Sequence, residues 1–218
     1  MPPPAMGGGI VICANKNRVS SHTMSLSEHR EERRTRNHAA TRAAILDAAH
    51  RVAARDGARD LSLRAVAAEA GYAPAALYGY FRNKDELLLA LAADDLSGLA
   101  RAMREEAQVH RDNKLSAAAA VALDLLENTE TFAAVSSALP SSAGSSDAER
   151  LFNGRMIAAL TALSEAVGGG TSREAQADVV LIAAALAGLA LLGRSGRLEA
   201  LGFDNTELLA RLERRFSA

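Results

Sequence analysis

Side chains that commonly carry catalysis or hold metals are sparse in this chain of 218 residues. Its five histidines, at positions 22, 29, 38, 50 and 110, have no metal-ligand spacing, and the single Cys13 excludes an intramolecular disulfide or a cysteine-based zinc site. Gly168-Gly169-Gly170 lacks the lysine and hydroxyl residue that complete a phosphate-binding loop. The acidic pairs Asp94-Asp95 and Glu105-Glu106 are expected on the exposed side of a long helix. The sequence therefore predicts no catalytic residue, metal site, cofactor or enzyme activity.

Basic side chains, in contrast, gather near the N-terminus. Residues 29–84 hold 11 basic and 6 acidic residues, a net of +5, whereas the remainder holds 14 and 20, a net of −6, and the two sum to −1. The run His29–Arg36 is either a solvated tail or a basic arm that follows a nucleic-acid backbone. A basic segment joined to an acidic body is typical of a DNA-binding protein.

The composition predicts packed helices. The chain has 48 alanines, 49% apolar residues, 4% aromatic residues and no tryptophan, which favours α-helices over a β-sandwich. The first residues lack the pattern of a secretory signal. The longest uncharged apolar run, Val179–Gly193, has 15 residues, fewer than the roughly 18–20 that span a bilayer. We expect a soluble, cytoplasmic, all-α protein without a membrane partner.

Apolar periodicity and breaker residues divide the chain into three regions. Residues 1–36, with three prolines and three glycines in two runs, are expected to be a disordered extension with a basic end, and Met24 is an alternative translation start. Residues 37–83 and 84–218 are expected to form two helical domains. The predicted helices cover about 39–56, 62–70, 74–83, 84–110, 117–139, 147–167, 172–193 and 206–216.

The three short helices within residues 37–83 are typical of a helix-turn-helix unit. Ser62 is a good N-cap for the second helix, Gly71 ends it, and Pro74 stands at the favoured first position of the third. Leu77 and Phe81 are expected to face inward. The other face of the third helix is then free to enter a DNA major groove about 12 Å wide.

The segment LSLRAVAAEAGYAPAALYGYFRNKDELL, residues 61–88, resembles the N-terminal DNA-binding domain of the TetR family of transcriptional regulators. The spacing of Ala70-Gly71, Leu77-Tyr78, Phe81 and the run Lys84–Leu87 carries the resemblance, which extends over about Ala39–Leu91. It implies a helix-turn-helix domain followed by a helical bundle for ligand binding and dimerisation. It also implies a homodimeric regulator, expected to be a repressor, that binds a pseudo-palindromic double-stranded DNA operator and is released by a small-molecule effector.

The resemblance also assigns DNA contacts. Ser62, Tyr78, Tyr80 and Lys84 would bind phosphates, Arg42 would add another, and Arg64 would read guanine through its bidentate guanidinium. The first turn of the recognition helix would face base edges with Ala73, Pro74, Ala75 and Ala76. Alternatives remain open: Tyr78 as a half-buried core residue, Arg64 on a solvated face, and Lys84 paired with a carboxylate.

Departures from the family pattern affect base recognition. The third helix has no polar cap at Ala73, and Gly79 replaces a larger side chain. The first turn carries no polar hydrogen-bonding side chain. Base recognition is therefore expected to depend on Arg64, on apolar contacts to thymine methyl groups and on DNA shape.

The C-terminal region predicts a dimer interface and an effector pocket. The run Val179–Gly193 is apolar on every side and must be covered, either by a partner subunit or at the centre of a monomeric bundle. The candidate dimer residues are Ala184, Gly188, Leu191, Leu208 and Leu212. The candidate ligand residues, most of them large and apolar, are Leu99, Met103, Asn128, Phe132, Phe152, Met156 and Leu160.

Two interpretations of the whole chain remain at this point. An apolar pocket lining favours an apolar or lipophilic effector, although each of these side chains is equally suited to core packing. The alternative to a DNA-binding regulator is an all-helical protein-interaction or lipophile-binding module that does not bind DNA.

Overall fold

The computed structural model describes residues 26–129, 131 and 147–216, and helices are the regular secondary structure within them. The predicted all-α class is confirmed. The chain divides into two compact parts, Met1–Ala39 and Ala40–Ala218, and each is described by itself. Cys13, Met24 and Phe132 lie outside the described residues, and the predictions for them stay predictions.

Helix α1 (Leu26–Asp56) begins thirteen residues before the predicted start at Ala39. The expectation that residues 1–36 are not folded is therefore corrected for residues 26–36. The side chains from 29 to 39 are exposed, and a helix that buries no face shows no apolar period in its sequence. Glutamate and arginine, which are frequent here, nevertheless have high helix propensity.

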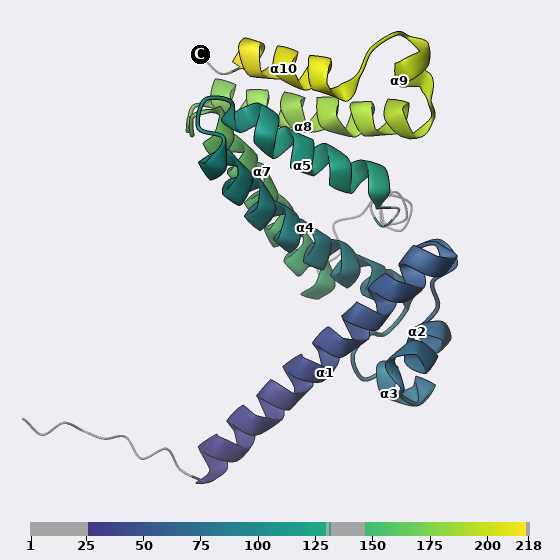
Figure 1. The fold of residues 1–218 in the computed structure, drawn as a ribbon. Coiled ribbons are helices and arrows are strands. Elements are labelled where there is room, and N and C mark those ends of the chain that lie inside the picture. Colours follow the sequence, from purple (N-terminus) through teal and green to yellow (C-terminus); the bar gives the residue numbers. More distant parts are fainter. Residues whose placement is uncertain (1–25, 130, 132–146, 217–218) are drawn as a thin grey trace, which may run out of the picture. The chain divides into compact units, whose positions relative to one another are not determined.

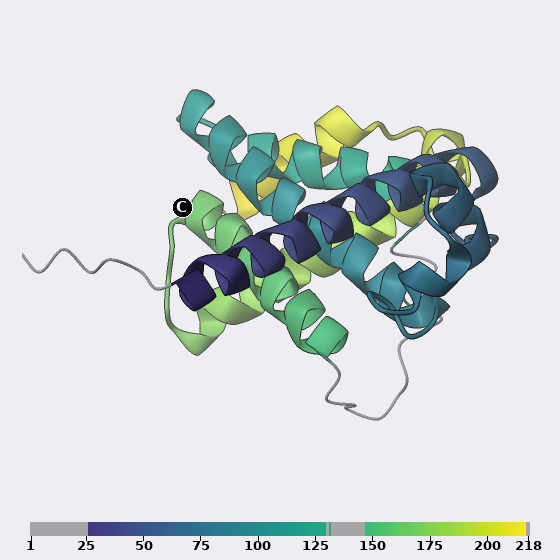
Figure 2. The same ribbon diagram turned by 90° about the horizontal axis from the view of Figure 1, so that it is seen from below.

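The second part opens with the helix-turn-helix elements. Residues 40–56 of α1 bury Ile45, Ala49 and Val52 completely, and Ala53 partly. Helices α2 (Leu63–Ala70) and α3 (Pro74–Leu77) lie beside this end of α1 in both views (Figures 1 and 2). The three elements therefore share one core, as a helix-turn-helix unit requires.

Local cap chemistry sets the bounds of α2, as predicted. The Ser62 side chain accepts a hydrogen bond from the backbone N–H of Ala65 at 3.2 Å. Gly71 ends the helix with φ +73°, a left-handed conformation that favours glycine.

Helix α3 is shorter than predicted and ends at Leu77 instead of near Arg82-Asn83. The N–H groups of Gly79 and Tyr80 bond to carbonyls three residues earlier, at 3.1 and 2.9 Å, so the chain tightens into a turn. Leu77 and Phe81 are buried as expected. The recognition segment is therefore one helical turn followed by a tight turn.

Helix α4 (Lys84–Val109) begins at the predicted residue and is buried at eleven positions. The Asn83 side chain caps it by accepting a hydrogen bond from Glu86 N–H at 2.8 Å. Seven consecutive residues, 87–93, are buried, so the helix is covered on every side directly after its first turn.

The remaining helices form the body around α4. They are α5 (Lys114–Asn128), α7 (Asp147–Val167), α8 (Arg173–Arg194), α9 (Arg197–Ala200) and α10 (Asn205–Phe216). Helix α4 packs against α7 and α5, and α5 in turn packs against α8 and α10 (Figure 1). This layout confirms a helical bundle that follows the helix-turn-helix elements.

Two predictions for the body were wrong. The helix predicted over 117–139 ends at Asn128, because Thr129 adopts an extended backbone with φ −113° and ψ 117°. The loop predicted over 196–205 contains the short α9. The apolar pattern showed no boundary at either place.

Polar contacts hold α10 against α5. Ser116 donates its hydroxyl to the Leu209 carbonyl at 3.1 Å, and its N–H donates to Glu213 Oε2 at 2.5 Å. At the other end, Asn205 Nδ2 donates to Glu127 Oε1 at 3.0 Å. The contacts at both ends fix the direction of the last helix.

The N-cap of α4 provides a matched test of the fold. We expect Asn83→Ala to lower the free energy of unfolding by about 1 kcal/mol, because it removes the side-chain acceptor at the cap. Asn113 stands at the same position of α5 but makes no side-chain cap hydrogen bond. Asn113→Ala should therefore have the smaller effect in urea unfolding, and equal effects of the two substitutions would contradict the cap assignment.

Candidate nucleic-acid interface

The turn between α2 and α3 is fixed by backbone hydrogen bonds and by buried side chains. Tyr72 N–H bonds to the Ala67 carbonyl at 2.9 Å, and Gly71 N–H bonds to the Ala68 carbonyl at 3.3 Å. Beneath the turn, Val66 and Leu77 are fully buried. The exposed face of α3 is therefore held in one orientation relative to α2.

Ion pairs attach α2 to α1. Glu69 accepts hydrogen bonds from Arg51 Nε at 2.8 Å and from an Arg55 guanidinium nitrogen at 3.1 Å. These bonds lower the pKa of Glu69 below its ordinary value. Arg55 also pairs with Asp56, which contributes most to the raised pKa of Arg55. Two of the basic residues counted in the sequence are thus already paired within the protein.

Two assigned phosphate ligands are held in place by other contacts. The Arg42 guanidinium lies 5.1 Å from the centre of the buried Phe81 ring, a cation–π distance. Lys84 Nζ donates a hydrogen bond to the backbone carbonyl of Arg59. The suggested carboxylate partner of Lys84 is thus replaced by a carbonyl, and two ammonium protons remain for another acceptor.

The residues assigned to DNA otherwise form an exposed set on α2, α3 and the turn after it. Tyr78 is 57% exposed, so the interpretation as a half-buried core residue is wrong. Arg64 is exposed and makes no hydrogen bond or ion pair with the described part of the chain. Tyr80 is half-buried and packs against the core. Exposed with them are Ser62, Ala73, Pro74, Ala75 and Ala76.

The small residues of α3 make its exposed surface flat and weakly polar. Ala73 begins the helix without a side-chain cap, as expected. A Cβ added at Gly79 would come within 3.3 Å of the Ala76 carbonyl oxygen, a close approach that favours a small residue in this turn. The backbone of α3 and the turn can therefore come close to a binding partner.

The predicted ligand residues do not form one group. Leu99, Met103 and Phe152 are buried in the core, and Met156 and Leu160 pack against it. Asn128 instead lies at the end of α5, where its Nδ2 donates to Asp124 Oδ1 at 2.8 Å. The structure thus separates the polar candidate from the apolar ones.

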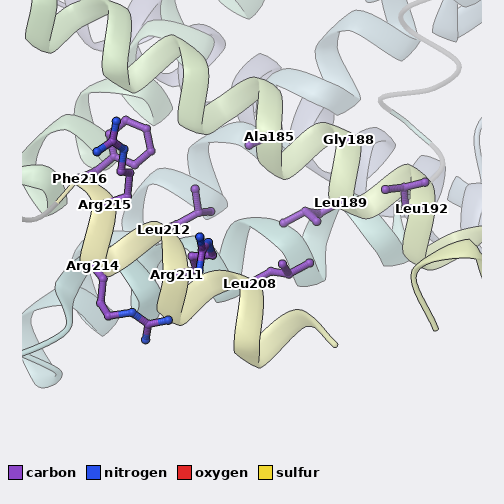
Figure 3. Close-up of a pocket in the computed structure, with 10 residues that line it drawn as sticks. All are labelled: Ala185, Gly188, Leu189, Leu192, Leu208, Arg211, Leu212, Arg214, Arg215 and Phe216. Carbon is purple, nitrogen blue, oxygen red and sulfur yellow. The ribbon is translucent and has the colours of Figure 1, made fainter. Parts of the chain in front are cut away.

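The predicted dimer residues lie along α8 and α10. Ala184, Gly188 and Leu191 are exposed on α8, with Leu191 67% exposed. Leu208 and Leu212 of α10 line a groove of about 700 Å³ against α8. In Figure 3, Leu212 points from α10 towards α8, whereas Arg214 points away. The exposed Val180 and Leu181, which were not among the candidates, extend the apolar surface of α8.

A polar cluster between α1 and α4 was missed. His50 Nε2 lies 3.3 Å from Asp94 Oδ2, and His50 Nδ1 lies 3.6 Å from Asp95 Oδ1. Asp94 is exposed as predicted, but the Asp95 side chain is only 11% exposed. A period of 3.6 residues does not show what a neighbouring helix covers, so the acidic pair gave no signal of this burial.

Comparison with known proteins identifies the N-terminal domain. Residues 45–91 match the family model described as bacterial regulatory proteins, tetR family. The HTH-type nicotine-responsive transcriptional repressor HdnoR of Paenarthrobacter nicotinovorans is 48% identical over 59 residues. That match covers 27% of this chain and 30% of the relative, so the alignment spans less than a third of either protein.

Solved structures extend the likeness to most of the chain. The regulator FadR from Bacillus subtilis, in complex with stearoyl-CoA, has a TM-score of 0.56 at 18% identity and covers 80% of this chain and 97% of its own. A TetR family transcription regulator from Marinobacter aquaeolei has a TM-score of 0.54 at 22% identity, covering 83% and 96%. At these identities the likeness establishes the fold.

Proposed function

We propose that this chain, a transcriptional regulator of the TetR family, is a repressor that binds a pseudo-palindromic operator as a homodimer and leaves it when a small molecule binds. The observation that carries the proposal is the exposed surface of α2, α3 and the following turn. It combines an unpaired Arg64, the exposed Tyr78 and a flat run of small residues in an orientation fixed by the core.

This surface suits a DNA groove for physical reasons. The first turn of α3 is free of bulky side chains, so its backbone can approach base edges and thymine methyl groups. Arg64 offers a bidentate donor to guanine, and Ser62, Tyr78 and Tyr80 offer hydroxyl groups for phosphates. Arg42 and Lys84 add positive charge from positions fixed by Phe81 and Arg59. Base contacts are few, so DNA shape contributes to specificity.

The N-terminal part of α1 adds a second basic surface. Its four arginines, Arg30, Arg33, Arg34 and Arg36, lie within about 160° of the helix circumference at 3.6 residues per turn. Glu31 and Glu32 lie outside this arc, and all six side chains are exposed. A helix with one basic face can follow a phosphate backbone, so of the two interpretations left open for this run we favour the basic arm.

The proposed dimer would use the exposed apolar face of α8. In a two-fold interface the same face of each subunit meets its copy, and the absence of a side chain at Gly188 allows close approach. The most apolar stretch of α8 has a mean hydropathy of 2.1, so by length and composition this helix could also cross a membrane. Core and interface helices have the same property, and α8 packs against α5 and α7.

The proposed effector site lies between α4 and α7, where Leu99, Met103, Phe152, Met156 and Leu160 meet. These side chains belong to one hydrophobic core or pack against it, so an apolar effector must displace some of them to enter. Helix α4 also carries Lys84 at its start, which is bonded to the α1–α2 loop. A ligand that moves α4 would therefore move the DNA-binding elements, and such coupling typically changes affinity about 5- to 150-fold.

Tyr78 provides the first test of the proposed DNA-binding surface on α2, α3 and the turn after it. We expect Tyr78→Phe to weaken binding to the DNA upstream of the protein's own gene by about 10- to 100-fold, because it removes a hydrogen bond to a charged phosphate. The control is Tyr72→Phe, which removes the same hydroxyl from an exposed tyrosine without an assigned DNA contact. A gel shift in which both variants bind like the wild type would contradict the assignment of Tyr78. If the wild type itself shows no salt-sensitive DNA binding, the result would favour the alternative of an all-helical module that does not bind DNA.

Salt dependence tests the basic arm. Changing Arg30, Arg33, Arg34 and Arg36 to glutamine should reduce the slope of log affinity against log salt by about 0.9 for each phosphate that the arm no longer neutralises, up to about 3.6. The matched control changes Glu31 and Glu32 to glutamine, which should not reduce the slope. An unchanged slope in the arginine variant would show that the arm is a solvated tail.

Charge on α8 tests the dimer. Leu191→Glu should convert the protein from twice the monomer mass to the monomer mass in analytical ultracentrifugation, because it buries a carboxylate in an apolar interface. Val109→Glu, at an exposed position at the end of α4, is the control and should stay dimeric. A wild-type monomer, or a Leu191→Glu variant that remains dimeric, would place the interface elsewhere.

A further inference from the structure

The groove between α8 and α10 combines an apolar lining with a basic end. Its larger apolar side chains are Leu189 and Leu192 from α8 and Leu208, Leu212 and Phe216 from α10. Its volume of about 700 Å³ is within the range of small-molecule sites, about 300–1,000 Å³. The groove is distinct from the apolar group of α4 and α7 that we propose for the effector, because none of those residues lines it.

The basic end of the groove comes from α10. Arg211 and Arg215 are one helical turn apart, and Leu208 and Leu212 lie on the same face of the helix. In Figure 3, Arg215 lies at the C-terminal end of α10, Leu208 lies near its start, and Arg214 points away from α8. The groove therefore has an apolar end and a basic end.

The two groove-facing arginines have no acidic partner in the part of the chain that the structure describes. Arg211 and Arg215 are exposed, and neither forms an ion pair or hydrogen bond with another described residue. Among the described residues, no aspartate or glutamate lines the groove. Glu213, which stands between the two arginines in the sequence, accepts a hydrogen bond from the Ser116 N–H of α5. Positive charge beside the apolar lining is therefore left uncompensated.

We propose that this groove binds a small amphipathic carboxylate, such as a fatty acid. Its carboxylate would lie between Arg211 and Arg215, because a guanidinium group binds a carboxylate through two parallel hydrogen bonds. Its alkyl chain would lie along the leucines towards Leu208 and Leu192, where its apolar surface is removed from water. A cationic amphiphile is disfavoured by the arginines, and an uncharged one leaves them without an anionic acceptor.

Charge favours this occupant over a second copy of the chain. In a two-fold interface the same surface of each subunit meets its copy, so two such grooves would bring the arginines of both subunits together. The acidic residues of α8, Glu174 and Asp178, precede Ala185, the first residue of α8 in the lining, by seven residues or more. A groove packed on its own copy would therefore contain like charges without an acid, which is unfavourable.

The ligand would also affect the proposed dimer. Gly188 lines the groove and is one of the residues that we propose for the contact between subunits. The carboxylate and the partner subunit therefore compete for part of α8. This competition rests on the proposed function, whereas the binding of a carboxylate in the groove does not.

The binding experiment compares octanoate with 1-octanol, an uncharged analogue with the same chain length, in calorimetry with the full chain. We expect octanoate to bind about 10- to 100-fold more tightly, the range for hydrogen bonds to a charged group. Changing both Arg211 and Arg215 to glutamine should remove this preference. The matched control changes Arg173 and Arg194, two exposed arginines of α8 outside the lining, to glutamine. It alters the net charge equally and should keep the preference.

Several outcomes would overturn the proposal. They are equal binding of the two probes to the wild type, an unchanged preference in the Arg211 and Arg215 variant, and an equal loss of the preference in the control. A wild-type dimer that takes up no octanoate would show that the second copy fills the groove.

Nuclear magnetic resonance of the wild type provides a measurement that does not depend on the folding of a variant. Octanoate should shift the amide signals of residues 185–192 and 208–216. Shifts confined to residues 99–103 and 152–160 would place the ligand at the proposed effector site and reject the groove. DNA binding measured without probe tests the proposed function separately.

Discussion

The burial of helix α4 is the constraint on which the rest of the structure depends. Residues 87–93 are buried on every side, and they share one hydrophobic core with Val66 and Leu77 of the helix-turn-helix elements and with Leu163 of the body. Further along, α4 lies against α7 and α5. Because protein interiors are close-packed, a displacement of α4 in the body must be accommodated by the elements at its other end. The proposed coupling between ligand and DNA uses this shared helix.

Charge has a similar dual role at the N-terminal end. The excess of basic residues between 29 and 84 suggests a DNA-binding segment, but Arg51 and Arg55 are held by Glu69 and stabilise the packing of α2 on α1. In the proposed function, Arg64, the arm, Arg42 and Lys84 would supply positive charge for DNA. Part of the basic composition therefore stabilises the fold, and the proposed function assigns another part to DNA.

Local signals in the sequence predicted the parts of the fold that local chemistry determines. The Ser62 cap, the Gly71 stop, the start of α4 and nearly all of α8 were correct, since caps and glycines act within a few residues. Features set by tertiary contact or by its absence were missed. The arm is helical but its exposed side chains give it no apolar period, and α5 ends where Thr129 turns the chain without a glycine or proline.

The same distinction between local and tertiary signals holds for the candidate site. The motif marked the exposed surface around Tyr78 because its residues are close in sequence, whereas His50 and Asp95 meet only in the fold.

The central claim, that two copies of this surface read one operator, is tested most directly by selecting DNA from a randomised pool with the full-length protein and sequencing what is retained. The account predicts an inverted repeat whose half-site centres are about 34 Å apart along the duplex, one helical turn, or a multiple of it. Enrichment of a single asymmetric motif would contradict the dimeric arrangement, and no enrichment would contradict sequence-specific DNA binding itself.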